Sequence, residues 1–118
     1  MTIANTPELD SLRALCIRDA ALLWKTGAVE KLLSNFFEVA ESDSGQFVEV
    51  IRHRAFDIAL IRHGGQVEAP RIVPLLREIG SENLAIVVLA EMPSSALELQ
   101  CLSAGASDFL DSEMDDER

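Results

Sequence analysis

The stretch FDIALIRHGG, Phe56 to Gly65, decides the fold of this 118-residue chain. Five of its first six residues are apolar or aromatic, the exception being Asp57. A short apolar run that ends at a Gly-Gly pair is typical of a strand buried on both faces of a parallel sheet. In open α/β sheets, ligands and chemistry lie just beyond the carboxyl ends of such strands. Arg62 occupies that place, so a permanent cation stands where function is expected.

Strand and helix patterns alternate on both sides of this stretch. We predict further strands at 12–17, 36–40, 85–90 and 108–110, and helices at 20–35, over about ten residues from 47, at 72–79 and at 96–104. Because proline is tolerated only in the first turn of a helix, Pro70 and Pro74 mark where the third helix begins. Strands that alternate with helices require right-handed crossovers. The fold class is therefore α/β, a doubly wound parallel five-stranded sheet.

The length and composition of the chain indicate one folded domain. Residues 1–10 read as a polar N-terminal arm, and 11–118 as the domain. Hydrophobic residues make up 48% of the chain, which is enough for a core and excludes disorder. No apolar run is long enough to span a membrane, and the first residues lack the features of a signal peptide. We therefore expect a cytoplasmic protein with no membrane partner.

The charge and the cysteines exclude further classes. A net charge of −10 argues against binding nucleic acid through this domain, since phosphate contacts need clustered Lys and Arg. Cys16 and Cys101 lie in apolar surroundings, and we expect two buried free thiols. No nucleophile–base pair or metal-ligand cluster is visible, so we expect no catalytic residues, no metal, no cofactor and no enzymatic activity.

The segment AGASDFL, 104–110, resembles the alanine-glycine-alanine-x-aspartate-aromatic segment that leads into the fifth strand of response-regulator receiver domains. The run at 56–61 is similar to the third receiver strand, and the likeness covers roughly residues 11–111. This resemblance implies a flavodoxin-like sheet with strand order 2-1-3-4-5. It also implies a final helix beside the fifth strand. The sequence stops where that helix would begin, so we expect the helix to be missing or truncated, and the chain to be a fragment or to receive that cover from a partner.

The residues that carry receiver function are mostly replaced. The resemblance assigns Arg62 to the phosphoacceptor aspartate, Arg18 and Asp19 to the metal-binding acids, Ala90 to the Ser/Thr after the fourth strand, Ser112 to the lysine and Phe109 to the switch aromatic. A guanidinium has no nucleophilic oxygen and stays protonated, and one carboxylate between two arginines is a poor Mg²⁺ site. The pattern therefore predicts a degenerate pseudo-receiver that works without phosphorylation.

Three roles remain open for Arg62. It could pair with Asp19 and close the pocket, swing into solvent, or bind an anion together with Arg18. Phe109 is more often a core residue than a switch in such a setting. A single His63 without a partner constellation does not predict catalysis or metal binding.

The fourth helix and fifth strand carry the residues of a possible dimer face. We expect Met92 and Leu97 to point outward and Leu99 and Leu102 to face the core, with Asp108 at the adjacent strand. Exposed apolar side chains here indicate a homodimer or a contact with a partner protein. The alternative is that they pack on the absent helix.

The sequence thus favours a phosphorylation-independent dimerisation or protein-interaction domain of a transcriptional response regulator in a two-component system. DNA would be bound only through a C-terminal domain outside this chain, of the winged-helix type. Two alternatives remain: an anion or small-ligand sensor that uses Arg18, Asp19 and Arg62, or a stand-alone signalling adaptor.

Overall fold

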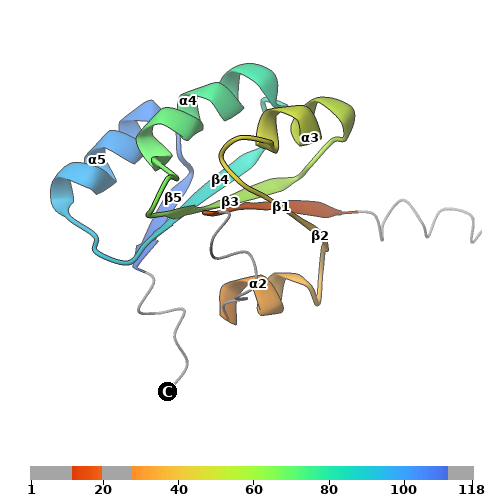
Figure 1. Ribbon diagram of the computed structural model, residues 1–118, viewed down its shortest axis with the longest axis horizontal. Coiled ribbons are helices and arrows are strands. Elements are labelled where there is room, and N and C mark those ends of the chain that lie inside the picture. Colours follow the sequence, from red (N-terminus) through yellow and green to blue (C-terminus); the bar gives the residue numbers. More distant parts are fainter. Residues whose placement is uncertain (1–11, 20–27, 112–118) are drawn as a thin grey trace, which may run out of the picture.

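The computed structural model describes residues 12–19 and 28–111, which form a parallel sheet between two layers of helices (Figure 1). The strands are β1 (Arg13–Ile17), β2 (Glu38–Ser42), β3 (Ile58–His63), β4 (Ala85–Ala90) and β5 (Asp108–Asp111). The helices are α2 (Ala28–Leu33), α3 (Phe47–His53), α4 (Ala69–Ile79) and α5 (Ser95–Ala104). Within the described part, α3, α4 and α5 lie on one face of the sheet and α2 lies on the other.

The sheet has the strand order β2-β1-β3-β4-β5, and every neighbouring pair is parallel. This confirms the predicted fold class. The strand order reverses between β1 and β3, so the carboxyl ends of these two central strands flank the switch point of the sheet. Arg18 follows β1 directly and Arg62 is the fifth residue of β3, which places both arginines at that point.

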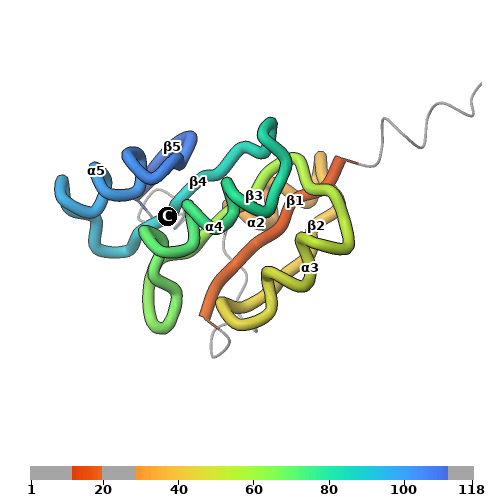
Figure 2. The backbone as a smooth tube through the Cα atoms, turned by 90° about the horizontal axis from the view of Figure 1, so that it is seen from above, coloured from red at the N-terminus to blue at the C-terminus, as the bar shows by residue number. Residues whose placement is uncertain are grey.

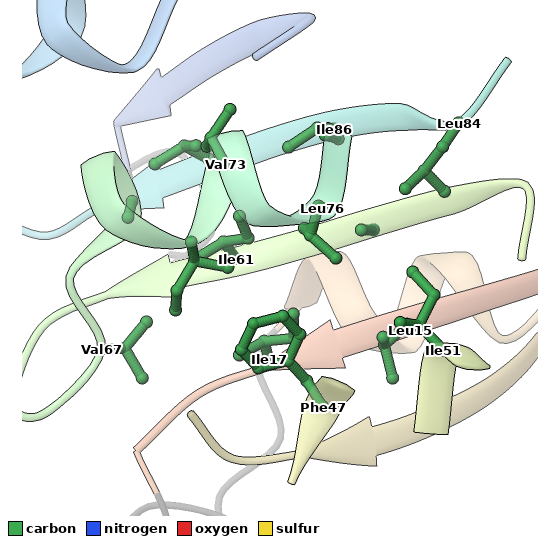
Figure 3. Close-up of a cluster of buried hydrophobic side chains, with 14 of the residues drawn as sticks. Leu15, Ile17, Phe47, Ile51, Ile61, Val67, Val73, Leu76, Leu84 and Ile86 are labelled. Carbon is green, nitrogen blue, oxygen red and sulfur yellow. The ribbon is translucent and has the colours of Figure 1, made fainter. Parts of the chain in front are cut away.

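The larger part of the core lies between the sheet and the layer of α3, α4 and α5. Figure 2 shows these three helices side by side over the strands. Figure 3 shows apolar side chains from the strands and from α3 and α4 meeting in one cluster: Leu15, Ile17, Phe47, Ile51, Ile61, Val73, Leu76 and Ile86 are among its members. Alternate residues of each strand point into this cluster because side chains in a strand alternate between its faces.

A smaller buried cluster lies on the other face, beneath α2. Its buried members are Cys16, Leu60 and Leu89, and the partly buried Val29 and Leu33 of α2 pack against it. Both cysteines are buried free thiols as predicted, Cys16 in this cluster and Cys101 in the larger one.

Two strands, β2 and β3, begin two residues later than predicted. Residues 36–40 were expected to form the second strand, but Phe36 lies in an exposed turn and β2 begins at Glu38, where the Glu38 N–H donates to the Leu12 carbonyl at 2.8 Å. The third strand was expected at 56–61, but it runs from Ile58 to His63. Arg62 therefore pairs with Leu89 inside the sheet rather than following the strand. The cause in both places is that backbone pairing, rather than apolar character, sets where a strand begins and ends.

The helices also depart from the prediction at particular points. The expected helix over 20–35 is described only from Ala28 to Leu33, and residues 20–27 lie outside the described part, as does the expected acidic tail from 112 onward. Pro74 was expected to mark the start of a helix, but it lies inside α4, five residues after Ala69. The missing N–H of Pro74 costs a backbone hydrogen bond. The helix continues through Pro74 because Ile72 and Val73 before it, and Leu76 after it, are buried.

Arg77 joins α4 to the segment between α5 and β5. Its Nε donates to the Gly105 carbonyl at 2.9 Å, its Nη1 to the Leu84 carbonyl at 2.6 Å, and its Nη2 to Ser107 Oγ at 3.2 Å. Gly105 has φ +123°, and a Cβ there would lie 3.0 Å from Arg77 Cγ. The glycine of the AGASDFL segment therefore permits both the turn and the close approach of the arginine.

Replacing Arg77 by methionine should lower the free energy of unfolding by about 2–3 kcal/mol, because two carbonyls and a hydroxyl lose a charged donor while the apolar stem is kept. Urea unfolding followed by circular dichroism measures the change. Arg52→Met, at an exposed residue in the last turn of α3, is the matched control and should cost less than about 1 kcal/mol. Equal losses in the two variants would show that the Arg77 contacts contribute nothing specific.

Candidate functional site

The Arg62 guanidinium binds the carboxylate of Glu30 through two hydrogen bonds. Arg62 Nε donates to Glu30 Oε2 at 2.6 Å, and Nη2 donates to Glu30 Oε1 at 2.9 Å. Glu30 comes from α2, and its side chain is 1% exposed, against 18% for Arg62. Two parallel bonds between a guanidinium and a carboxylate form the strongest and most directional ion pair available to side chains. Arg62, which the resemblance assigned to the phosphoacceptor position, is thus one half of a largely buried ion pair.

Arg18 extends this ion pair to the edge strand β2. Its Nη1 lies 3.8 Å from Glu30 Oε2, and its Nη2 lies 3.0 Å from Glu41 Oε2. The Arg18 side chain is 2% exposed, and its backbone N–H donates to the Ser42 carbonyl at 3.0 Å. We call Arg18, Glu30 and Arg62, together with the more exposed Glu41 at the edge of the sheet, the buried ion-pair cluster. It places two formal positive charges against two formal negative charges, so the buried cations have carboxylate partners.

Asp19 has a different partner from the one expected. Its Oδ2 accepts a hydrogen bond from the Gln66 N–H at 2.9 Å, in the turn between β3 and α4. Gly65 has φ +59°, and a Cβ at this residue would lie 1.8 Å from Asp19 Oδ2. The Gly-Gly pair therefore lets the carboxylate reach the backbone of the turn. The predicted ion pair between Arg62 and Asp19 is wrong, because the Arg62 guanidinium binds the carboxylate of Glu30 from α2.

The residues at this end of the sheet do not fit the magnesium ion that the receiver pattern implies. Of the two acids such a site needs, one is replaced by Arg18, and the remaining Asp19 is bound to the turn at Gln66. Mg²⁺ prefers several oxygen ligands in octahedral geometry, and two guanidinium groups nearby oppose it electrostatically. Within residues 12–19 and 28–111, no group of three or more His, Cys, Asp or Glu side chains could hold a metal ion.

The other positions of the receiver pattern have ordinary structural surroundings. Ala90 ends β4, is fully buried, and pairs with His63 and Asp111 across the sheet. Phe109 is partly buried and packs against the larger core cluster. Ser112 lies outside the described residues. The methyl group of Ala90 offers no hydroxyl to a phosphoryl group.

Cys16 lies on β1 close to the buried ion-pair cluster. Burial in the first place, and then the negative charges of Glu30 and Glu41, raise the pKa of its thiol to about 12. Burial also raises the pKa of the Cys101 thiol. Both cysteines are therefore protonated thiols at neutral pH and poor nucleophiles.

His63 has a structural role that the sequence did not indicate. It is the last residue of β3, and its Nδ1 accepts a hydrogen bond from the Ala69 N–H at 3.1 Å. Ala69 is the first residue of α4, where backbone N–H groups lack partners within the helix. Glu68 at the preceding position makes no side-chain cap, so the imidazole replaces it as the cap of this helix.

The residues of the expected dimer face, in α5 and in the loop before it, are only partly where they were predicted. Met92 is exposed as predicted, at 86%. Leu97 was expected to point outward, but it packs against the larger core cluster together with Cys101 and Ala104 of the same helix. Leu99 and Leu102 were expected in the core, but they are 66% and 40% exposed. The prediction was wrong because it placed the inward face of the helix two residues from its true position.

Asp108, the other residue proposed for this face, is exposed at the start of β5. Its Oδ1 accepts a hydrogen bond from the Phe109 N–H at 2.8 Å. Met92, Leu99, Leu102 and Asp108 are therefore all exposed, but Met92 lies beyond the carboxyl end of β4 whereas Asp108 begins β5 opposite Val87.

Glu30 and Glu41 are the residues that the sequence analysis missed. Glu30 lies between Val29 and the partly buried Leu33 in a helical pattern, so it reads as a residue of the polar face. Its burial follows only from α2 lying against β1 and β3. The sequence offered only a partial signal. Two arginines at the ends of buried strands require carboxylates nearby in space, but Glu30 is 32 residues from Arg62 in the chain, so the sequence does not single it out.

A double-mutant cycle on Glu30 and Arg62 should show strong coupling. Glu30→Gln leaves two buried guanidinium groups short of a carboxylate and should lower the free energy of unfolding by about 3–5 kcal/mol. Arg62→Gln should also destabilise, and the double variant should lose less than the sum of the two single losses by at least about 1 kcal/mol. Urea unfolding of the four proteins gives the coupling energy.

The matched control is the exposed ion pair between Glu68 and Arg71 on α4, where Arg71 Nε lies 3.2 Å from Glu68 Oε1. The same cycle of glutamine substitutions there should give a coupling of at most about 0.5 kcal/mol. A coupling between Glu30 and Arg62 no larger than this control would contradict the role given to the buried pair.

Solved structures of response regulators have the same fold as this chain. A response regulator from Burkholderia pseudomallei superposes with a TM-score of 0.73 and 18% identity, over 86% of this chain and 59% of that one. The orphan response regulator HP1043 of H. pylori gives 0.69 and 20%, over 86% and 83% of the two chains. The receiver domain of NarL from Mycobacterium tuberculosis gives 0.69 and 20%, over 88% and 86%.

No protein-family model and no curated protein sequence matches the chain. The described helices include none that is long and apolar enough to cross a membrane. The likeness therefore rests on the five-stranded order, the helices on both faces and the AGASDFL turn into β5. The chain has the flavodoxin-like fold of the response-regulator receiver domains.

Proposed function

We propose that this chain is a phosphorylation-independent pseudo-receiver that acts as a regulatory contact domain, without enzymatic activity. The observation that carries the proposal is the Arg62–Glu30 pair at the phosphoacceptor position. Arg62 cannot accept a phosphoryl group as an aspartate does, because a guanidinium is a permanent cation without a nucleophilic oxygen. Its guanidinium instead forms an ion pair with Glu30, which links β3 to α2.

A structural neighbour illustrates the difference. The Burkholderia pseudomallei response regulator contains a phosphorylated aspartic acid and a calcium ion. In this chain the corresponding edge of the sheet holds Arg18 and Arg62 with their carboxylate partners. The guanidinium groups of Arg18 and Arg62 thus lie where a metal ion and a phosphoryl group would otherwise bind and leave. Regulation would therefore have to act through binding to another protein rather than through phosphate.

The exposed side chains of α5 support contact through that helix. Leu99 and Leu102, three residues apart on α5, expose apolar surface; Met92 in the loop before this helix and Asp108 at the start of β5 are also exposed. Apolar side chains that gather on one face of a folded domain mark association sites more often than single exposed residues do. We therefore propose a homodimer through α5 and β5, with contact to a different protein as the alternative use of the same face.

The domain would serve a transcriptional response regulator in the cytoplasm, with DNA bound by a winged-helix domain outside these residues. The net charge of −10 supports this division, since the domain itself repels a phosphate backbone. A stand-alone adaptor is the alternative without an effector domain.

The anion-sensing alternative receives no support from the geometry of the site. Arg62 is bound by both oxygens of Glu30, and the Arg18 side chain is 2% exposed. An anion at Arg18, Asp19 and Arg62 would have to displace Glu30 and would lie beside the Asp19 carboxylate. Both conditions oppose binding.

Incubation with acetyl phosphate and Mg²⁺ should leave the protein unmodified. Intact-mass spectrometry should detect no phosphorylated species, and sedimentation should give the same oligomeric state with and without the phosphodonor. A receiver domain with its aspartate intact, treated in parallel, controls for the activity of the phosphodonor. A phosphorylated species, or a dimer that forms only with acetyl phosphate, would refute phosphorylation independence.

Leu99→Glu should weaken the proposed dimer at least tenfold, about 1.4 kcal/mol, because it places a charge in the centre of the apolar α5 surface. Sedimentation equilibrium measures the dissociation constant. Leu32→Glu on α2 is the matched control, since Leu32 is similarly exposed at 60% but lies on the other side of the sheet. Equal weakening by both substitutions, or a wild-type protein that stays monomeric, would rule out a homodimer through α5.

A further inference from the structure

We propose that His63 is an acid-sensitive cap of α4. The neutral imidazole fixes the first turn of this helix to the end of β3, and protonation of the imidazole releases it. This turn lies at the edge of the sheet that carries Arg18 and Arg62. The cap acts whether or not the domain dimerises or accepts phosphate, so it goes beyond the proposed contact role.

The first turn of α4 has one backbone amide whose acceptor comes from outside the helix. Two of its N–H groups donate to the Glu68 carbonyl, at 2.9 and 3.2 Å, and Pro70 has no N–H to donate. The N–H of Ala69 donates to His63 Nδ1 at 3.1 Å, and Ala69 is fully buried. Because a buried N–H without an acceptor is costly, the closed form of this turn depends on the imidazole.

The direction of this hydrogen bond fixes the protonation state of the His63 ring. A backbone N–H can only donate, so Nδ1 is the acceptor and the ring is neutral with its hydrogen on Nε2. Protonation of Nδ1 sets two donors against each other. It also brings a positive charge to the helix N-terminus, where the helix dipole is positive. Imidazole groups take up a proton between about pH 8 and pH 5, so the cap is present at neutral pH and is lost in mild acid.

The charged groups on the elements next to His63 do not replace the lost acceptor. They form two ion pairs and two further carboxylates: Glu68 with Arg71 on α4, Arg62 of β3 with Glu30, Asp19 after β1, and Glu91 after β4. Each ion pair is neutral as a whole. The two further carboxylates attract an imidazolium, so they assist the release of the cap in acid.

Release of the cap opens the first turn of α4 and leaves the rest of the domain in place. Before this turn, Gly64 and Val67 exchange two backbone hydrogen bonds, at 3.0 and 2.9 Å, and Val67 packs in the larger core cluster (Figure 3). After it, the buried Ile72 and Leu76 keep α4 on the sheet. Acid therefore changes the backbone between Val67 and Ile72, at the edge where open α/β sheets bind their ligands.

The first test uses the full wild-type chain and nuclear magnetic resonance. At about pH 8, spectra of the imidazole nitrogens should show His63 with its hydrogen on Nε2, and a hydrogen on Nδ1 would overturn the cap. The protection factor of the Ala69 amide against hydrogen exchange should fall about three- to tenfold between about pH 7.5 and pH 5.5, because an ordinary imidazole is about nine-tenths protonated at the lower pH.

The Gly80 amide is the internal control for this measurement. It lies at the other end of α4 and donates to the Leu76 carbonyl at 2.8 Å, so its acceptor does not titrate. Its protection factor should change less than about twofold over the same pH range. Equal changes at Ala69 and Gly80 would show that the domain responds to acid as a whole, and would overturn a local cap.

The second test replaces each of the two histidines of the chain in turn. In His63→Asn the amide oxygen can take the place of Nδ1 and accept without titrating, so the Ala69 protection factor should become independent of pH within about twofold. His53→Asn, at an exposed residue of α3, should keep the wild-type loss in acid. A loss that persists in His63→Asn would overturn the role of His63. If His63→Asn does not fold, His63→Ala decides: without an acceptor, protection of Ala69 should be low at both pH values, and an unchanged loss in acid would again overturn the proposal.

Discussion

The carboxylate of Glu30 is the constraint on which the functional end of this domain depends. It binds Arg62 of β3 through both oxygens and lies 3.8 Å from Arg18 after β1, so one residue of α2 meets both central strands of the sheet. Two arginines at the ends of buried strands would otherwise be uncompensated charges in a protein interior. Because α2 brings Glu30 to them, both arginines have a carboxylate partner where the side chains are largely buried.

The same ion pairs give two arginines carboxylate partners at the switch point of this flavodoxin-like sheet. In a scaffold with clustered acids at this edge, a cation is needed to offset their repulsion. In this chain the positive charge comes from the side chains of Arg18 and Arg62, at the ends of two strands. Asp19, the acid that remains, is bound to the turn at Gln66, which closes over it because Gly65 has no side chain. The positive charge at this edge of the sheet is therefore a fixed part of the structure.

The scaffold around this edge follows from patterns that are local in the sequence. The apolar runs at 56–61 and 85–90 and the helical spacing of Ile72, Leu76 and Ile79 predicted the parallel sheet, and the AGASDFL segment carried the resemblance that implied its order. The run at 85–90 became β4 with the predicted bounds. The prediction from apolar patterns was wrong where backbone pairing or tertiary packing decides the place of an apolar residue. Phe36 is exposed in a turn, and Leu99 faces outward while Leu97 faces the core.

The sequence by itself determined the α/β class, because the alternation of strands and helices depends on apolar spacing along the chain, and the resemblance to receiver domains added the strand order that the structure has. The tertiary structure alone decided which carboxylate Arg62 binds. Asp19 is adjacent to Arg18 in the chain, yet Glu30 is the partner, since packing of α2 against β1 and β3 brings its side chain to the guanidinium while Asp19 turns to Gln66. Ion-pair partners depend on side-chain direction and burial, and neither is encoded by distance along the chain.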